Sequence, residues 1–147
     1  MKQEAKQEII VTGAGIEYEW SSDHIFVKTT GEVTDGRASM VVDTLKPGFH
    51  LARHYHKKMT EIFYILEGEV TFIFDNETIV TTVGTTVNIP PNVWHEAKSA
   101  SGAKMMSIFS PAGFEAYLAE MATLTDENFA DEAFMNRLNE KYDIWNS

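Results

Sequence analysis

The sequence contains no cysteine among its 147 residues. It therefore forms no disulfide bonds and offers no thiolate metal ligands, so histidine and carboxylate side chains are left as its strong ligands. Basic residues are also few, since 12 lysines and arginines stand against 22 aspartates and glutamates, for a formal net charge of -10. This charge repels nucleic acid and anionic membrane surfaces, and we expect neither as a partner.

Long apolar runs are absent as well, because no segment approaches the length needed to span a bilayer. The opening residues, MKQEAKQEIIVTG, mix charges and lack the apolar region of a secretion signal. We therefore expect a cytoplasmic protein. The length lies within the roughly 100 to 200 residues of one domain, and the composition is that of a folded globular chain.

Short β-branched and aromatic runs, separated by Gly, Pro, Asn and Asp, fill residues 9–110 and predict an all-β sandwich or barrel. In EVTFIF, the alternation sets Val70, Phe72 and Phe74 on one face, which we expect to point into the core. Residues 1–8 are rich in Lys, Gln and Glu and are expected to form a flexible N-terminus. The clearest runs are HIFVKTTG, ASMVVDTL, EIFYILEG, EVTFIF, ETIVTTVG, TTVNIP and KMMSIF.

The apolar period lengthens in residues 111–147, which predicts a C-terminal helical tail of two α-helices packed on the barrel. Pro111 suits the first turn of the first helix, which carries Phe114, Tyr117, Leu118 and Met121 at helical spacing. Thr125 is expected to cap the second helix, whose apolar positions are Phe134, Leu138 and Tyr142.

Three potential metal ligands stand close together in GFHLARHYHKKMTEIFYILEG, residues 48–68. Because side chains alternate along a strand, His54 and His56 point the same way, about 7 Å apart, close enough to hold one ion. Glu61 lies an odd number of residues from both histidines, so an unbroken strand would point it away. The polar segment KKMT between them is expected to contain a turn or bulge that restores convergence.

A fourth ligand is expected from GTTVNIPPNVWHEAKS, residues 84–99. Asn92 follows a proline and tolerates a left-handed conformation, so a tight turn there is expected to aim His95 inward. Imidazole and carboxylate ligands suit Fe, Mn, Ni, Co or Zn. We therefore expect one divalent metal ion as the cofactor.

The two segments resemble the two cupin motifs at full length. In the second motif, Asn92 stands where glycine is usual and Ser99 where asparagine is usual, and neither is a ligand. The resemblance implies a double-stranded β-helix, the cupin or jelly-roll barrel, with a divalent metal held by His54, His56, Glu61 and His95. The residues that carry it are Gly48, His54, His56, Glu61 and Gly68, followed by Gly84, Pro90, Asn92 and His95.

The segments FVKTTGEVTDGRASMV and SPAGFEAYLAEM extend the resemblance to cupins grouped with the quercetin dioxygenases. This likeness implies a metal-dependent oxidoreductase, of the dioxygenase kind, acting on a small organic substrate such as a phenol. It also implies that Glu61 acts as both metal ligand and general base.

The substrate pocket is expected to include His50, Phe63, Phe72, Trp94 and Met106, because ligand pockets are mostly apolar with a few polar groups. For each of these residues singly, the alternative is a structural role as barrel filling or, for His50, as a surface histidine. Met40 and Met105 are further candidates for the same apolar surface.

Two other functions stay open at this point. One is a non-catalytic cupin that binds a small ligand as a sensor, and the other is a cupin sugar isomerase or epimerase, which favours a polar, basic pocket. A homodimer is expected, because closed twofold assemblies are the commonest and cupins often pair through their sheets.

Overall fold

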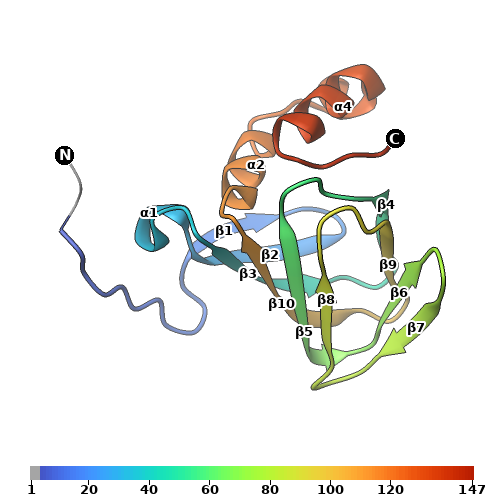
Figure 1. Ribbon diagram of the computed structural model, residues 1–147, viewed down its shortest axis with the longest axis horizontal. Helices are drawn as coiled ribbons and strands as arrows, with labels where there is room; N and C mark the ends of the chain where they lie inside the picture. The colour runs from blue at the N-terminus through green and yellow to red at the C-terminus, as the bar shows by residue number, and fades with distance from the viewer. Residues whose placement is uncertain (1–3) are drawn as a thin grey trace.

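A computed structural model describes residues 4–147, which fold into two antiparallel β-sheets with the C-terminal helices at one end (Figure 1). The larger sheet has six strands in the order β1-β2-β3-β10-β5-β8, and the smaller has four in the order β4-β9-β6-β7. The two sheets face each other, and the chain crosses between them several times. This arrangement is the jelly-roll barrel expected from the sequence.

The strands are short and are joined mostly by tight turns. Their bounds are β1 Ile16–Glu19, β2 Asp23–Thr29, β3 Ser39–Leu45, β4 Phe49–His54, β5 Thr60–Gly68, β6 Val70–Phe74, β7 Thr78–Thr81, β8 Thr86–Ile89, β9 His95–Ser99 and β10 Ala103–Ser110. The helices are α1 Gly31–Thr34, α2 Phe114–Met121, α3 Asp126–Ala130 and α4 Glu132–Lys141.

Each of the seven runs singled out in the sequence contains a strand. In β6, Val70 and Phe72 are fully buried and Phe74 packs against the same core cluster, so the predicted inward face is confirmed. The first strand begins later than expected, at Ile16. Residues 4–9 are exposed and have no regular secondary structure, whereas residues 1–3 of the expected flexible start lie outside the described residues.

Gly68 shows why a glycine is needed where β5 turns into β6. Its φ is +76°, a left-handed conformation that side chains disfavour. A Cβ atom there would also lie 2.6 Å from the carbonyl oxygen of Gly102. The close approach of the two chain segments therefore depends on the absence of a side chain.

The C-terminal tail contains three helices rather than the expected two. The first begins at Phe114, three residues after Pro111, and the second predicted helix is divided at Asp131 into α3 and α4. Asp131 adopts an extended conformation and accepts a hydrogen bond from the backbone N–H of Phe134, so its side chain starts a new helix. Thr125 forms the expected cap of α3.

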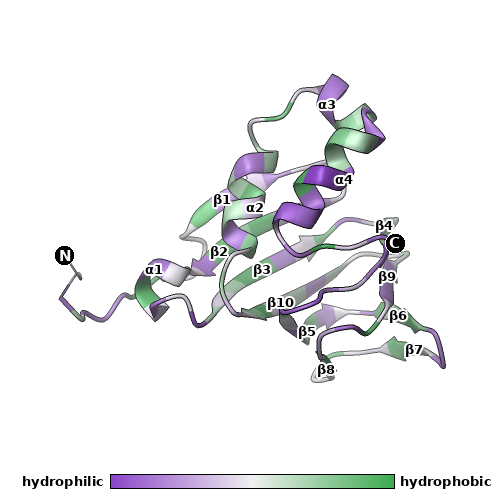
Figure 2. Cartoon of the chain, turned by 45° about the horizontal axis from the view of Figure 1, so that its top comes forward, coloured by the Kyte–Doolittle hydropathy of each residue, from purple (hydrophilic) through white to green (hydrophobic). Residues whose placement is uncertain are grey.

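The helical tail covers one end of the barrel. Leu118 of α2 lies in a buried cluster with Ile25, Val41 and Phe109 of the larger sheet. Figure 2 shows that much of α4 is hydrophilic. Among residues 4–147, the structure contains no helix long and apolar enough to cross a membrane.

Candidate metal centre

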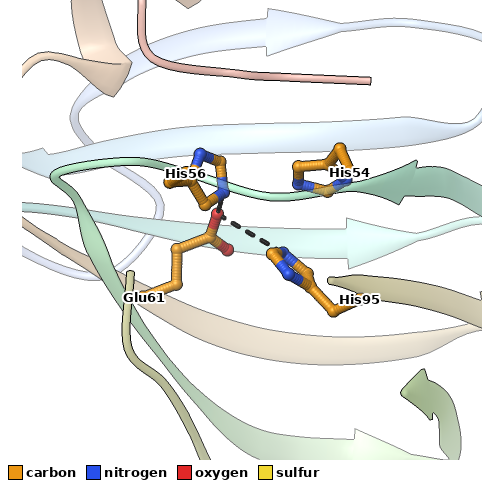
Figure 3. A group of neighbouring side chains, drawn as sticks. All are labelled: His54, His56, Glu61 and His95. Carbon is orange, nitrogen blue, oxygen red and sulfur yellow. Dashed lines mark ion pairs between the residues drawn. The ribbon is translucent and has the colours of Figure 1, made fainter. Parts of the chain in front are cut away.

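Four side chains from both sheets meet inside the barrel (Figure 3). His54 ends β4, His56 follows two residues later, and His95 begins β9 beside them in the smaller sheet. Glu61 comes from β5 in the larger sheet. The KKMT segment is therefore more than the local turn or bulge expected from the sequence, because it carries the chain from one sheet to the other and makes Glu61 face the histidines.

One nitrogen of each histidine ring is bound to a main-chain carbonyl oxygen. The Nδ1 atoms of His54, His56 and His95 lie 2.7, 2.7 and 2.9 Å from such oxygens. A carbonyl accepts only, so each Nδ1 carries its proton and donates. In a neutral ring the Nε2 atom then bears the free lone pair, which is the tautomer needed to bind a metal ion.

The Nε2 atoms are directed into the cluster. Those of His56 and His95 are buried without a hydrogen-bond partner of normal geometry, and both lie beside Oε1 of Glu61, His95 at 3.8 Å. One ligand atom from each of the four residues lies within 4.8 Å of the others, and all four residues are buried. Because buried polar atoms normally have partners, this arrangement fits a divalent ion bound by three imidazoles and one carboxylate.

The electrostatics favour the metal-binding forms of His54 and Glu61. Burial lowers the pKa of His54 to about 4, assisted by the nearby His95, so its ring is neutral at physiological pH. Burial raises the pKa of Glu61, but contacts with His56 and His95 outweigh burial and hold it below its ordinary value. Burial likewise lowers the pKa of His56, yet the Glu61 carboxylate raises it by more.

Asn92 forms the tight turn that the sequence predicts before His95. Its φ is +67°, in the left-handed region, and its backbone N–H donates to the carbonyl oxygen of His56 at 2.6 Å. The turn before β9 is thus tied directly to a second histidine of the cluster. An asparagine serves here in place of the usual glycine because it tolerates this conformation.

Asp143 is a functional residue that sequence reasoning missed. Its carbonyl oxygen accepts the Nδ1 hydrogen of His56 at 2.7 Å, and its carboxylate accepts the backbone N–H groups of Lys57, Lys58 and Met59. Hydrogen bonds to Asp143, near the end of the chain, therefore hold the segment that bears His56 in place. No local pattern signals this contact, because the two partners lie 87 residues apart.

A cavity of about 680 Å³ opens beside the four side chains. Of the five residues predicted to form a substrate pocket, His50 and Phe63 line this cavity and the other three do not. Phe72 is fully buried in the core, and Trp94 packs against Tyr55 and beneath Arg53.

Met106 also lies outside the cavity, because it alternates with Met105 along β10. Met105 and Ser107 point inward and are buried, which leaves Met106 on the opposite face. Met105 therefore lines the cavity in place of Met106. Both residues are methionines, so the sequence alone does not distinguish the two faces.

The fold and the site together define a jelly-roll barrel whose interior carries three histidines and one glutamate in a metal-ligand arrangement. Residues 41–109 match the family model described as "Cupin domain". This match agrees with the two motifs, and the chain resembles the cupin superfamily in its motifs and in its fold.

One similar protein is the quercetin 2,3-dioxygenase of Bacillus subtilis (strain 168), with 33% identity over 85 residues. The match covers 57% of this chain and 25% of that protein, so the chain spans about a quarter of the relative's length.

Solved structures share the fold at low sequence identity. KdgF from Halomonas sp. has a TM-score of 0.66 and 14% identity, and the match covers 74% of this chain and 99% of that one. An RmlC-like cupin from Shewanella frigidimarina NCIMB 400 has a TM-score of 0.65 and 21% identity, with 76% and 98% covered. These likenesses establish the barrel and leave the reaction to be argued from the site.

Proposed function

We propose that this cupin-like protein is a metal-dependent oxidoreductase of the dioxygenase type that acts on a small phenolic molecule. The observation that carries the proposal is the set of buried, converging ligand atoms at the edge of a cavity large enough for such a molecule. The similarity to quercetin 2,3-dioxygenase supports the reaction class. His54, His56, Glu61 and His95 are the proposed ligands.

A bound divalent ion would supply Lewis acidity and, if it is redox-active, a route for electrons between substrate and dioxygen. The chain's own residues supply position and environment. Carbonyl oxygens hold each imidazole in one tautomer and orientation, so little reorganisation is needed on binding. Phe63, Phe109 and Phe114 line the cavity and offer flat apolar surfaces to an aromatic ring.

Glu61 is the proposed general base. It is held ionised beside the cavity, and an ionised carboxylate oxygen can accept the proton of a substrate hydroxyl placed within hydrogen-bond reach. Glu61 is also the only carboxylate among the four proposed ligands, because the other three are histidines.

The alternative of a sugar isomerase or epimerase has less support. Such a reaction favours a polar, basic pocket, whereas no lysine or arginine lines this cavity in the described part of the chain. A non-catalytic binding protein is distinguished from an oxidoreductase by the measurement of oxygen consumption described next.

The experiment compares Glu61→Gln with the parent after both are loaded with the same metal. Oxygen consumption is measured across a panel of phenols and small acids and is expressed per bound ion. Gln keeps the shape and one metal-facing oxygen but removes the base, so we expect lower turnover per ion. Glu67→Gln, at an exposed position on the same strand, is the matched control and should behave as the parent.

Equal activity per ion in Glu61→Gln and the parent would remove the general-base role. Stoichiometric metal without oxygen consumption for any substrate in the panel would favour the binding protein instead.

We also propose that the protein is a cytoplasmic homodimer. The composition supports the location, and apolar side chains exposed in the monomer, such as Ile9, Val11 and Val80, supply surface that a second copy could cover.

A further inference from the structure

A second polar group faces the same cavity as the metal centre. Asp23 of β2 and Asp43 of β3 lie on neighbouring strands and on the same inward face, with exposed fractions of only 8% and 6%. Both residues line the cavity. Sequence reasoning missed them, although each is an acidic residue at an inward position of an alternating strand.

The two carboxyl groups are hydrogen-bonded to each other and the backbone N–H of His24 also reaches Asp23, yet one oxygen of the pair has no donor. Ser107 of β10 donates its hydroxyl to Oδ2 of Asp43 at 3.2 Å, whereas Oδ1 of Asp23 is buried and has no hydrogen-bond partner. A buried acceptor without a donor is costly, so it points to a ligand that supplies one.

The electrostatic surroundings of Asp23 and Asp43 also favour a ligand that donates hydrogen bonds. Burial, reinforced by the charge of Asp43, raises the pKa of Asp23 to about 10, and burial also raises the pKa of Asp43. The charge of Lys46 lowers the pKa of Asp23, but its ammonium group already donates to the carbonyl oxygen of Trp20 at 2.8 Å. Glu61 adds negative charge on the side of Asp43. A cation brought by a ligand would relieve this accumulation of carboxyl groups.

The rest of the cavity suits an organic cation with an aromatic body. Trp20, Phe114 and Tyr117 contribute aromatic surfaces, and Asp126 contributes a further carboxylate. Aromatic faces attract cations, and carboxylates form short, charge-assisted hydrogen bonds with ammonium groups. The lining contains no lysine or arginine in residues 4–147 that would attract an anionic group.

We propose that Asp23 and Asp43 bind the ammonium group of a small aromatic amine, whose ring lies along the aromatic wall toward His54, His56, Glu61 and His95. This inference names the substrate class of the proposed oxidoreductase and rests on that function for its catalytic meaning. The binding itself is independent of turnover. The ammonium group donates to Oδ1 of Asp23 and to the carboxyl group of Asp43.

The test measures binding of three probes that share one phenol ring and differ at the end of the side chain. These are tyramine, 2-(4-hydroxyphenyl)ethanol and 4-hydroxyphenylacetate, which are cationic, neutral and anionic at pH 7.5. Calorimetry with the protein as purified is expected to show tyramine binding at least tenfold tighter than the alcohol, and the acid binding most weakly.

Two isosteric variants, Asp23→Asn and Asp43→Asn, should each bring the tyramine-to-alcohol affinity ratio close to one. Each replaces one carboxyl group by a neutral amide, so a failure of one variant to fold leaves the other to decide. Asp75→Asn, at an exposed position paired with Arg53 outside the cavity, should keep the parent's ratio.

Equal affinities for the three probes, absence of tyramine binding at millimolar concentration, or a preference that survives both substitutions would overturn the assignment. Each of these results leaves the oxidoreductase proposal standing. Conversely, amine selectivity in a protein that binds no metal at the four ligands would contradict the proposed function and leave the amine site in place.

Discussion

Removing the carboxylate of Asp143, which lies outside the metal centre, should lower both the stability of the protein and its affinity for metal. This carboxylate lies 2.8 to 2.9 Å from the backbone nitrogens of Lys57, Lys58 and Met59 and 3.0 Å from the indole nitrogen of Trp145. The carbonyl oxygen of the same residue holds Nδ1 of His56. Asp143→Gly deletes the four carboxylate contacts and suits the left-handed φ of +63°.

The loss in free energy of unfolding can be estimated from the contacts that Asp143→Gly removes. Asp143 is partly exposed, so each of its three backbone hydrogen bonds is expected to stabilise by about 1 kcal/mol, the value of an ordinary hydrogen bond and less than that of a buried charged acceptor. We therefore expect the free energy of unfolding of Asp143→Gly to fall by about 3 kcal/mol. Partners that orient a ligating histidine typically change metal affinity 10- to 100-fold, so a loss on the order of tenfold is expected.

Urea denaturation measures the first quantity, and competition with a chromophoric chelator measures the second. Asp143→Asn is the matched control, because it tolerates the left-handed conformation and keeps one acceptor oxygen, so it should lose about half as much stability. If Asp143→Gly unfolds at the parent's urea midpoint and binds metal as tightly, the C-terminal segment does not position His56 and the reasoning is refuted.

Three further predictions concern other parts of the fold. Burial raises the pKa of Tyr117 from 10.0 to about 12, so its contribution is complete below pH 10 and disappears as pH rises toward 12; stability should fall by about 3 kcal/mol across that window in the parent but not in Tyr117→Phe. Asn92→Gly should leave stability and metal affinity near the parent's, while Asn92→Val, which opposes the positive φ, should cost at least about 1 kcal/mol in denaturant unfolding. Light scattering at micromolar concentration should report a dimer, and a monomer alone would contradict that assembly.

Strand positions and the candidate ligand set follow largely from the sequence, because both depend on local alternation and on short motif spacings. Val70 and Phe72 are inward as their period-two pattern predicts. The convergence of His54 and Glu61 was also predicted, but its cause was not. A bulge and a crossing between sheets both reverse the direction of a side chain, and only tertiary structure distinguishes them.

The pocket was harder to predict because its walls come from distant segments. KMMSIF has apolar residues on both faces, so the alternation does not reveal that Met105 faces the cavity and Met106 does not. Tyr117 of α2 reaches the same cavity from the helical tail. Asp43 left a readable signal, since a carboxylate among the buried positions of β3 is unusual unless it has a partner.

The most direct test of the account is the location of the metal ion. Protein purified without chelator and loaded separately with Fe, Mn, Co, Ni and Zn should show, by anomalous scattering, one ion within ~2.1 Å of the Nε2 atoms of His54, His56 and His95 and bound to the Glu61 carboxylate. Absence of an ion from this position with every metal, or a stoichiometric ion bound elsewhere, would contradict the account.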